Sequence, residues 1–237
     1  MASSFQFKQF SVLQDRCAMK IGTDGVLLGA WVCLQKNPKS ILDIGAGTGI
    51  IALQLAQRST ATTIDAVEID DDAFEQCAEN FETSPWADRL FCYHASIQEF
   101  ASEIEEKYDL IISNPPFYRE DYKTENEARD TARFEDALPF QHLIVCAAHL
   151  LSESGTFAVI LPKKEVDSFI ALASENQLFP KRICEVKGTP SSTIKRVLVE
   201  FSFRKLDPKN ETLTIEVSRH QYTPEYKQLV KDFYLKM

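Results

Sequence analysis

From residue 40 onward, apolar runs typical of strands alternate with segments of helical periodicity. The strand-like runs are SILDI, IDAVEI, RLFCYH, YDLIIS and GTFAVILP, and each precedes a helical pattern. This regular alternation is typical of βαβ units, in which consecutive strands lie parallel in one sheet. We therefore predict a mostly parallel sheet whose strands end at one edge, where open α/β sheets bind their ligands.

The end of this series predicts a different strand pairing. Two further strand-like runs, LFPKRICEV and TIKRVLVEFSF, are joined only by KGTPSS. Because this connection is too short for a parallel crossover, the two strands should pair antiparallel. The predicted fold is α/β, with a seven-stranded, mostly parallel sheet, an antiparallel C-terminal strand pair and helices on both faces.

The chain is predicted to form one domain over residues 1–237. Residues 37–205 would form its core, and residues 1–36 an extension with a short hairpin and an apolar helix. Residues 206–237 would form a tail packed on the core, with one strand candidate, TLTIEV, and a terminal amphipathic segment.

Composition excludes several classes of protein. A hydrophobic content of 44% supports a sizeable core, and no run approaches the roughly 20 apolar residues that span a membrane. The N-terminus lacks the apolar run of a secretory signal. The six cysteines include no CxxC pair, which favours reduced thiols. We expect a soluble cytoplasmic protein without membrane attachment, and no obligate protein partner is evident.

A metal site is the less favoured interpretation of one helical pattern. His142, Cys146 and His149 would share one face of a helix. An ordinary amphipathic stripe explains this spacing, and no fourth ligand is visible. We therefore predict no metal.

The loop ILDIGAGTGII carries three glycines, Gly45, Gly47 and Gly49, between a strand and a helix. Glycines at this place permit a tight turn and a close approach of backbone amides to a ligand. Glu68 ends the next strand about 20 residues later, where an acid can accept hydrogen bonds from ribose hydroxyls. The pair predicts a nucleotide-type site, although dinucleotide binding or close helix packing would also use such glycines.

The GxGxG spacing, with Asp43 two residues upstream, resembles motif I of the class I methyltransferases that use S-adenosylmethionine (SAM). The resemblance implies a Rossmann-like fold, a loop packed against the amino-acid end of SAM, and Glu68 on its ribose. Ser96 and Ile97 follow the third strand, where the family usually contacts the adenine of SAM with an acid. A serine hydroxyl can still accept that bond, but Ser96 is equally suited to cap the next helix.

The fourth strand ends in SNPPFY, and Asn114, Pro115, Pro116 and Phe117 resemble motif IV of the amino-methyltransferases. An exocyclic amine is a poor nucleophile because its lone pair is delocalised into the ring. The Asn114 side-chain oxygen and the Pro115 carbonyl could accept its hydrogens, while the prolines fix the backbone and Phe117 stacks on a flipped base. The alternative, a simple strand break at two prolines, leaves the glycine loop and Glu68 unexplained.

The resemblance extends over nearly the whole chain. The stretch FKQFSVLQDRCAMKIGTDGVLLGAW, together with SPWADR, ARDTAR and the terminal FYLKM, resembles the bacterial enzymes that methylate N6 of adenine 37 in a valine tRNA. That family implies SAM as cofactor, S-adenosylhomocysteine as product and the anticodon stem-loop of tRNA(Val) as partner. It also implies that Lys20, Thr23 and Asp24 cover the cofactor pocket, as motif X does. Capping of the following helix is an alternative role for Thr23 and Asp24.

The substrate side is less defined by the sequence. The net charge of −9 is unusual for a protein that binds nucleic acid, because phosphate contacts normally supply much of the affinity. Pairing with nearby acids or a solvated face would explain each basic residue as well as RNA contact would. The candidate substrate-binding residues are Tyr118, Arg129, Arg133, Lys163, Lys164, Lys195 and Arg196.

Other functions remain open from the residues alone. Methyltransferases that act on a glutamine amide of release factors share Asn-Pro-Pro-Tyr but lack the DRCAMKIGTDG signature. Methylation of N6-adenine in another RNA or in DNA would use the same motif IV. A binding module without activity is disfavoured by the intact Asn114–Phe117 segment.

Overall fold

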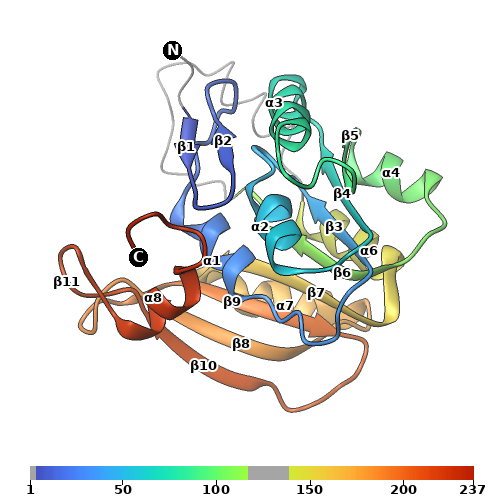
Figure 1. Cartoon of the computed structure of the whole chain (residues 1–237). Helices are drawn as coiled ribbons and strands as arrows, with labels where there is room; N and C mark the ends of the chain where they lie inside the picture. Colours follow the sequence, from blue (N-terminus) through green and yellow to red (C-terminus); the bar gives the residue numbers. More distant parts are fainter. Residues whose placement is uncertain (1–3, 117–138) are drawn as a thin grey trace, which may run out of the picture.

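The computed structural model describes residues 4–116 and 139–237 (Figure 1). Its centre is an eight-stranded sheet with the order β10-β8-β9-β7-β6-β3-β4-β5. The strands are β3 (Ser40–Ile44), β4 (Thr63–Glu68), β5 (Leu90–His94), β6 (Tyr108–Ser113), β7 (Leu151–Pro162), β8 (Phe179–Lys187), β9 (Ile194–Ser202) and β10 (Lys209–Thr214).

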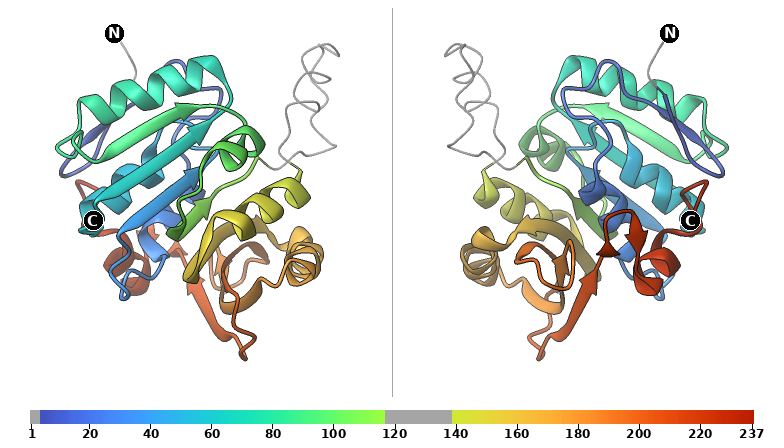
Figure 2. Two further views of the ribbon diagram at one scale, coloured as in Figure 1. Left: turned by 90° about the vertical axis from the view of Figure 1, so that its right-hand side faces the viewer. Right: turned by 90° about the vertical axis from the view of Figure 1, so that its left-hand side faces the viewer.

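Helices cover both faces of this sheet (Figure 2). One face carries α1 (Thr23–Trp31), α2 (Ile50–Arg58), α3 (Asp71–Glu82) and α8 (Pro224–Val230). The other carries α4 (Ile97–Glu103), α6 (Phe140–Leu150) and α7 (Val166–Glu175), the last preceded by the 3-10 turn η1 (Lys163–Glu165).

Successive side chains along each strand point alternately to the two faces of the sheet. In β3, Ile41 packs with the first set of helices, whereas Leu42 and Ile44 pack with the second. All three side chains are at most 1% exposed. Because both faces are buried, the strand reads as a continuous apolar run, as is usual for parallel sheets.

The strand pairing confirms the predicted α/β class and corrects its strand count. Strands β3 to β6 are parallel, and β9 pairs antiparallel with both β7 and β8. The prediction of seven strands is wrong by one, because β10 from the tail adds parallel to β8 at the sheet edge. This strand is mostly polar, and of its residues only Leu213 is buried, so its sequence signal is weak.

Segments near the two ends of the chain lie side by side on the α1 side of the molecule (Figure 1). The short hairpin of β1 (Ser4–Gln6) and β2 (Ser11–Leu13) confirms the predicted N-terminal hairpin. Phe7 forms an isolated antiparallel bridge with Tyr234, and Lys8 N–H donates to the Phe233 carbonyl at 2.8 Å. A second small pairing, β11 (Glu216–Ser218) with β12 (Gln221–Tyr222), lies between β10 and α8 in the chain.

Candidate active site

Three neighbouring strands end level with one another. Ile44 at the end of β3 is in register with Val67 of β4 on one side and with Ser113 of β6 on the other. The residues that follow these positions are therefore brought together at the carboxyl edge of the sheet, and they are Gly45, Glu68 and Asn114. Asn114 and Pro116 are half-buried, and Pro115 is buried.

The glycine loop has two open positions and one closed position. Gly45, Gly47 and Gly49 all have positive φ, at 71°, 55° and 75°, which favours glycine. A Cβ at Gly45 or Gly47 would meet nothing within 4 Å, whereas a Cβ at Gly49 would lie 2.5 Å from Phe81 and 2.9 Å from Cys77. The first two glycines thus leave room for a ligand, and the third permits close packing on α3.

Glu68 ties the loop to the next strand. Its Oε2 accepts a hydrogen bond from Gly47 N–H at 2.8 Å, and its Oε1 accepts from Ile69 and Asp70 N–H at 2.8 and 3.0 Å. A carboxylate offers about four acceptor sites, so capacity remains for a hydroxyl group of a ligand. Glu68 as a whole residue is 8% exposed, and Ile69 beside it is 53% exposed.

Asp43 lies behind the loop rather than on its surface. Its side chain is fully buried, and Oδ2 accepts a hydrogen bond from Ala52 N–H at 3.1 Å. Burial raises the pKa of this carboxyl from 3.8 to about 7, since the one backbone hydrogen bond offsets only part of the desolvation. Asp43 therefore joins β3 to α2.

Ser113 joins the two strands that carry the glycine loop and motif IV. Its hydroxyl donates to the Ile44 carbonyl at 2.8 Å, and the side chain is fully buried. The bond fixes the last residue before Asn114 against the last residue before Gly45.

The N-terminal segment differs in part from expectation. The N-cap of α1 is Gly22, and no side chain makes a capping bond there. The alternative prediction that Thr23 or Asp24 caps this helix is therefore wrong. Asp24 instead pairs with Arg196, whose Nε lies 2.6 Å from Oδ2. Lys20 is exposed.

Cys17 shows how near this N-terminal segment comes to the site. The pKa of its thiol is raised to about 12, chiefly by burial and then by the negative charges of Glu68 and Asp70. Next to Cys17, Arg16 N–H donates to Gln76 Oε1 at 3.0 Å, so this part of the chain lies against α3, the helix that follows β4.

Ser96 caps α4, one of the two roles that its sequence position left open. The Ser96 hydroxyl accepts from Glu99 N–H at 3.2 Å, and the Glu99 carboxylate accepts from Ser96 N–H at 3.0 Å. This is a complete capping box, with Ile97 as the first helical residue and buried. Contact of Ser96 and Ile97 with a cofactor stays a prediction.

The basic candidates are mostly engaged with acids. Lys163 lies 2.8 Å from Glu185, and Lys164 lies 3.5 Å from Glu165. Lys195 is exposed. Four further candidates, Phe117, Tyr118, Arg129 and Arg133, lie outside the described residues.

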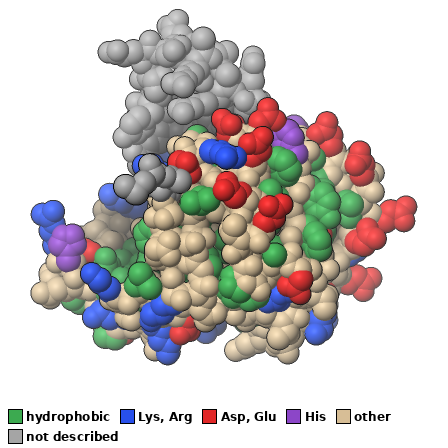
Figure 3. All heavy atoms as spheres, turned by 45° about the horizontal axis from the view of Figure 1, so that its top comes forward, with side chains coloured by type: hydrophobic (Ala, Val, Ile, Leu, Met, Phe, Trp, Pro, Cys, Tyr) green, Lys and Arg blue, Asp and Glu red, His purple; other side chains and the backbone are tan. Residues whose placement is uncertain are grey.

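Charge is unevenly distributed over the surface. Acidic residues outnumber basic ones in residues 4–116, and the balance reverses in residues 139–237. In the face shown in Figure 3, acidic side chains gather at the top and right, and basic side chains gather mainly toward the left and the lower edge.

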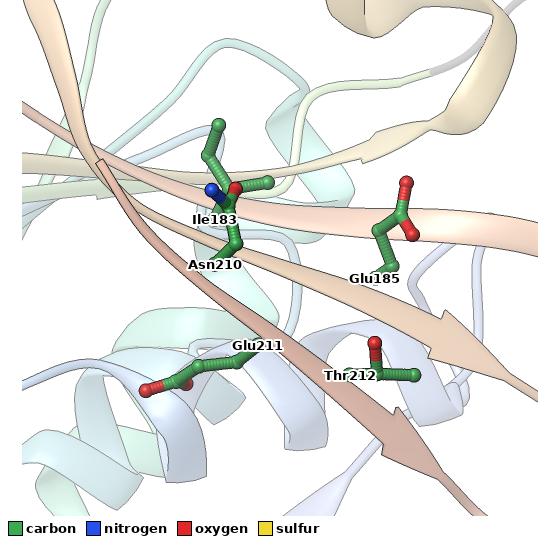
Figure 4. Close-up of a pocket in the computed structure, with 5 residues that line it drawn as sticks. All are labelled: Ile183, Glu185, Asn210, Glu211 and Thr212. Carbon is green, nitrogen blue, oxygen red and sulfur yellow. The ribbon is translucent and has the colours of Figure 1, made fainter. Parts of the chain in front are cut away.

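An open hollow over β8 and β10 lies away from the glycine loop. It is lined by Ile183, Glu185, Asn210, Glu211 and Thr212 (Figure 4). In the sheet, β9, β7 and β6 separate β8 from β3. The hollow therefore belongs to the opposite edge of the molecule.

The described residues contain neither a cluster of metal ligands nor a membrane-spanning helix. Among residues 4–116 and 139–237, no group of three or more His, Cys, Asp or Glu side chains is placed to hold a metal ion. Within these ranges no helix has the length and apolar character needed to cross a bilayer.

Comparison with known proteins agrees with the geometry of this site. Residues 25–173 match the family model described as the methyltransferase small domain. A protein of Flavobacterium johnsoniae named tRNA1(Val) (adenine(37)-N6)-methyltransferase is 62% identical over 98% of this chain and 100% of its own length. The chain belongs to this family. A tRNA1(Val) (adenine(37)-N6)-methyltransferase of Bacteroides fragilis is 47% identical, with 98% of each chain covered.

Solved structures confirm the methyltransferase fold of the family. A predicted O-methyltransferase from Agrobacterium tumefaciens has a TM-score of 0.68 at 20% identity, and covers 89% of this chain and 96% of its own. The tRNA m1G37 methyltransferase of M. jannaschii has a TM-score of 0.58 at 15% identity, and covers 86% of this chain and 55% of its own. At these identities the likeness concerns the fold alone.

Part of the SPWADR stretch that resembles this methyltransferase family supports the fold. Arg89 donates to the carbonyls of Ala56, Ser59 and Ala61 at 2.6, 3.2 and 2.7 Å, at the end of α2. The carbonyls at a helix C-terminus lack partners within the helix, so a cation that donates to them stabilises that end. Trp86 packs edge-on against Phe10, with ring centroids 5.8 Å apart.

Two residues that contact the site region were missed from the sequence. Gln76 and Asn80 lie on the inner face of α3, and both side chains are fully buried. Both bond to the N-terminal segment, and Asn80 also bonds to the glycine loop. A signal was present, because the helical pattern places these polar residues in the apolar stripe of Ala73, Cys77 and Phe81.

Proposed function

We propose that this protein transfers the methyl group of SAM to N6 of adenine 37 in the anticodon stem-loop of tRNA(Val), and that it acts in the cytoplasm. One observation carries the proposal: β3, β4 and β6 end in register with one another, so Asn114, which follows β6, lies beside the glycine loop, which follows β3. The name shared by the close relatives supports the substrate.

The residues at this edge fit SAM. Open space at Gly45 and Gly47 leaves room for a ligand against the loop, and Glu68 keeps acceptor capacity for a ribose hydroxyl. When bound, SAM supplies a methyl group that the sulfonium has already activated. The further proposed cofactor contacts are Lys20, Thr23, Asp24, Ser96, Ile97 and Asn114; Asp43 would act from behind the loop.

Asn114 and Pro115 would prepare the target amine. The Asn114 side-chain oxygen and the Pro115 carbonyl can each accept one N–H of the adenine amine, which holds the amine in place and weakens its conjugation with the ring. Pro116 has no N–H and restricts the geometry of Pro115, so the Pro115 carbonyl keeps its direction. The bond from Ser113 to the Ile44 carbonyl keeps this segment beside the loop.

The RNA would approach across the carboxyl ends of β7 and β8 and the amino end of β9. Lys163 and Lys164 follow β7, and Lys195 and Arg196 lie at the start of the antiparallel β9, so all four lie at the edge that carries Asn114. Acids hold three of these cations in the free protein, so phosphate contact would need an exchange of partners. Tyr118, Arg129 and Arg133 are proposed to contact the base or its phosphates.

Transfer of tritium from labelled SAM tests the substrate. We expect transfer to a tRNA(Val) transcript with adenine 37, and none when that adenine is replaced by guanine. Equal transfer to the guanine variant would refute the assignment of adenine 37.

Asn114→Ala tests the role of motif IV. We expect SAM affinity to fall only slightly, because Asn114 is one of several proposed cofactor contacts. Turnover at saturating SAM should fall by on the order of 10²-fold, because one positioned hydrogen-bond partner of the reacting group is lost. Calorimetry with SAM and single-turnover kinetics with the transcript measure the two effects. An unchanged rate would contradict the mechanism.

Two alternatives share the same motif. Incubation with a release factor and labelled SAM tests methylation of a glutamine amide, and parallel reactions with other RNAs and with DNA test other N6-adenine substrates. Methylation of a release factor, or equal methylation of unrelated nucleic acids, would replace the proposed substrate.

A further inference from the structure

Asn80 lies where three parts of the molecule meet. It is on the inner face of α3, and its side chain is fully buried. Helix α3 follows directly from the site, because its N-cap, Asp70, comes two residues after Glu68. On the other side of Asn80 lie the N-terminal segment and the glycine loop.

The oxygen and both hydrogens of the Asn80 side-chain amide form hydrogen bonds that join these parts. Its Oδ1 accepts from Leu13 N–H at 2.8 Å, and its Nδ2 donates to the Leu13 carbonyl at 2.9 Å. The side chain thus pairs with both backbone groups of Leu13, the last residue of β2, as a neighbouring strand would. The second hydrogen of Nδ2 goes to the carbonyl of Thr48, also at 2.9 Å.

Thr48 lies between Gly47 and Gly49, so this last bond reaches the centre of the glycine loop. The loop is then held from two sides, by the Glu68 carboxylate at Gly47 N–H and by the Asn80 amide at the Thr48 carbonyl. Since three glycines leave the loop backbone little intrinsic preference, its shape depends on such bonds.

Gln76, one helical turn earlier, makes a useful contrast. It is equally buried and faces the same N-terminal segment, where its Oε1 accepts from Arg16 N–H at 3.0 Å. No hydrogen bond joins Gln76 to the glycine loop within the described residues. Gln76 therefore anchors the N-terminal segment alone, whereas Asn80 anchors that segment and the loop together.

We propose that Asn80 is a positioning residue for SAM binding, which holds the glycine loop and the N-terminal segment of residues 13–21 in one fixed relation. This inference rests on the proposed function, because it assumes that SAM binds against the loop. Asn80 does not touch the reacting atoms. It acts through the Thr48 carbonyl and the Leu13 backbone, and so affects cofactor affinity rather than the methyl-transfer step.

The test compares Asn80→Ala with Gln76→Ala. Each variant loses one buried amide on the same helix, so both should melt at a lower temperature than the wild type. We expect Asn80→Ala to bind SAM and S-adenosylhomocysteine about tenfold or more weakly by calorimetry, since the loop loses its bond. Gln76→Ala should stay within about threefold, and kcat at saturating SAM should change little in either variant.

Asn80→Asp serves as a second variant that keeps the shape of the side chain. It retains the acceptor for Leu13 N–H, but as a carboxylate it loses both donated bonds, so SAM binding should weaken as it does in Asn80→Ala. Folded Asn80→Ala or Asn80→Asp with wild-type affinity would overturn the inference. An equal loss in Gln76→Ala would also overturn it, because the loop bond would then be irrelevant. Failure of the wild type to bind SAM would overturn the proposed function as well.

Discussion

At the scale of single residues, Asp43 carries a cost that depends on pH. Its carboxyl is fully buried, and its pKa is raised from 3.8 to about 7. A raised folded-state pKa means that this group favours the folded state below about pH 4 and that the contribution is lost as pH rises through about 7. At higher pH the ionised carboxylate is buried with a single hydrogen bond from Ala52 N–H.

Asp43→Asn should remove this pH dependence. Its amide oxygen can still accept from Ala52 N–H, but no charge is buried. We expect the variant to melt above the wild type at about pH 8 and the difference to shrink toward about pH 4. Thermal unfolding followed by circular dichroism measures this, with exposed Glu82→Gln as control. A gap that does not vary with pH would contradict it.

Gly49 and Gly45 have the same backbone constraint but different surroundings. Both have positive φ, so alanine at either position strains the backbone by about 1 kcal/mol. Gly49→Ala also collides with Phe81 and Cys77 and should lose a further 1 to 3 kcal/mol or so of stability.

Gly45→Ala should remain well folded but bind SAM weakly, because its methyl group enters the open side of the loop. Urea unfolding and calorimetry with SAM measure the two effects. Equal stability losses in the two variants would show that α3 can move aside at Gly49.

At the scale of elements, the carbonyl ends of two helices each accept hydrogen bonds from an arginine that lies elsewhere in the chain. Arg58 donates to Gly29 and Val32 at the end of α1, and Arg89 donates to three carbonyls at the end of α2. Arg89→Ala should lower the free energy of unfolding by about 2 to 3 kcal/mol, as buried carbonyls lose charged donors.

Arg16→Ala is a matched control, since Arg16 is half-exposed and pairs with Glu75 and Glu79 at the surface. It should cost no more than about 1 kcal/mol. Urea denaturation compares the two variants. A similar loss in both would mean that the end of α2 finds water as a replacement for Arg89.

A feature could be predicted from the sequence when its residues are close together in the chain, and not when they meet only in the folded structure. The glycine loop, Glu68 and Asn114 were found because each belongs to a local pattern at a strand end. The pair of Asp24 and Arg196 was not found, because its members come from α1 and β9 and meet only in the folded chain. Strand β10 was undercounted since an edge strand needs little apolar surface to pair through its backbone.

At the scale of the whole molecule, the C-terminal tail fastens the N-terminal hairpin. Phe233 is 1% exposed, its carbonyl accepts from Lys8 N–H, and neighbouring Tyr234 packs against Phe5 and Phe7. The hairpin in turn leads through Leu13 into the segment that Asn80 anchors. A loss of packing at the C-terminus should therefore loosen the N-terminal hairpin and the segment after Leu13 that lies near the glycine loop.

Phe233→Ala should lower the free energy of unfolding by about 3 to 5 kcal/mol, the usual cost of removing a buried phenylalanine. Leu235→Ala, two residues later and 59% exposed, should cost almost nothing.

Hydrogen exchange should also rise in residues 4–13 of the Phe233 variant before it rises in β3, because the hairpin depends on the tail and β3 lies inside the sheet. Simultaneous loss of protection in both segments would show that hairpin and sheet unfold as one unit.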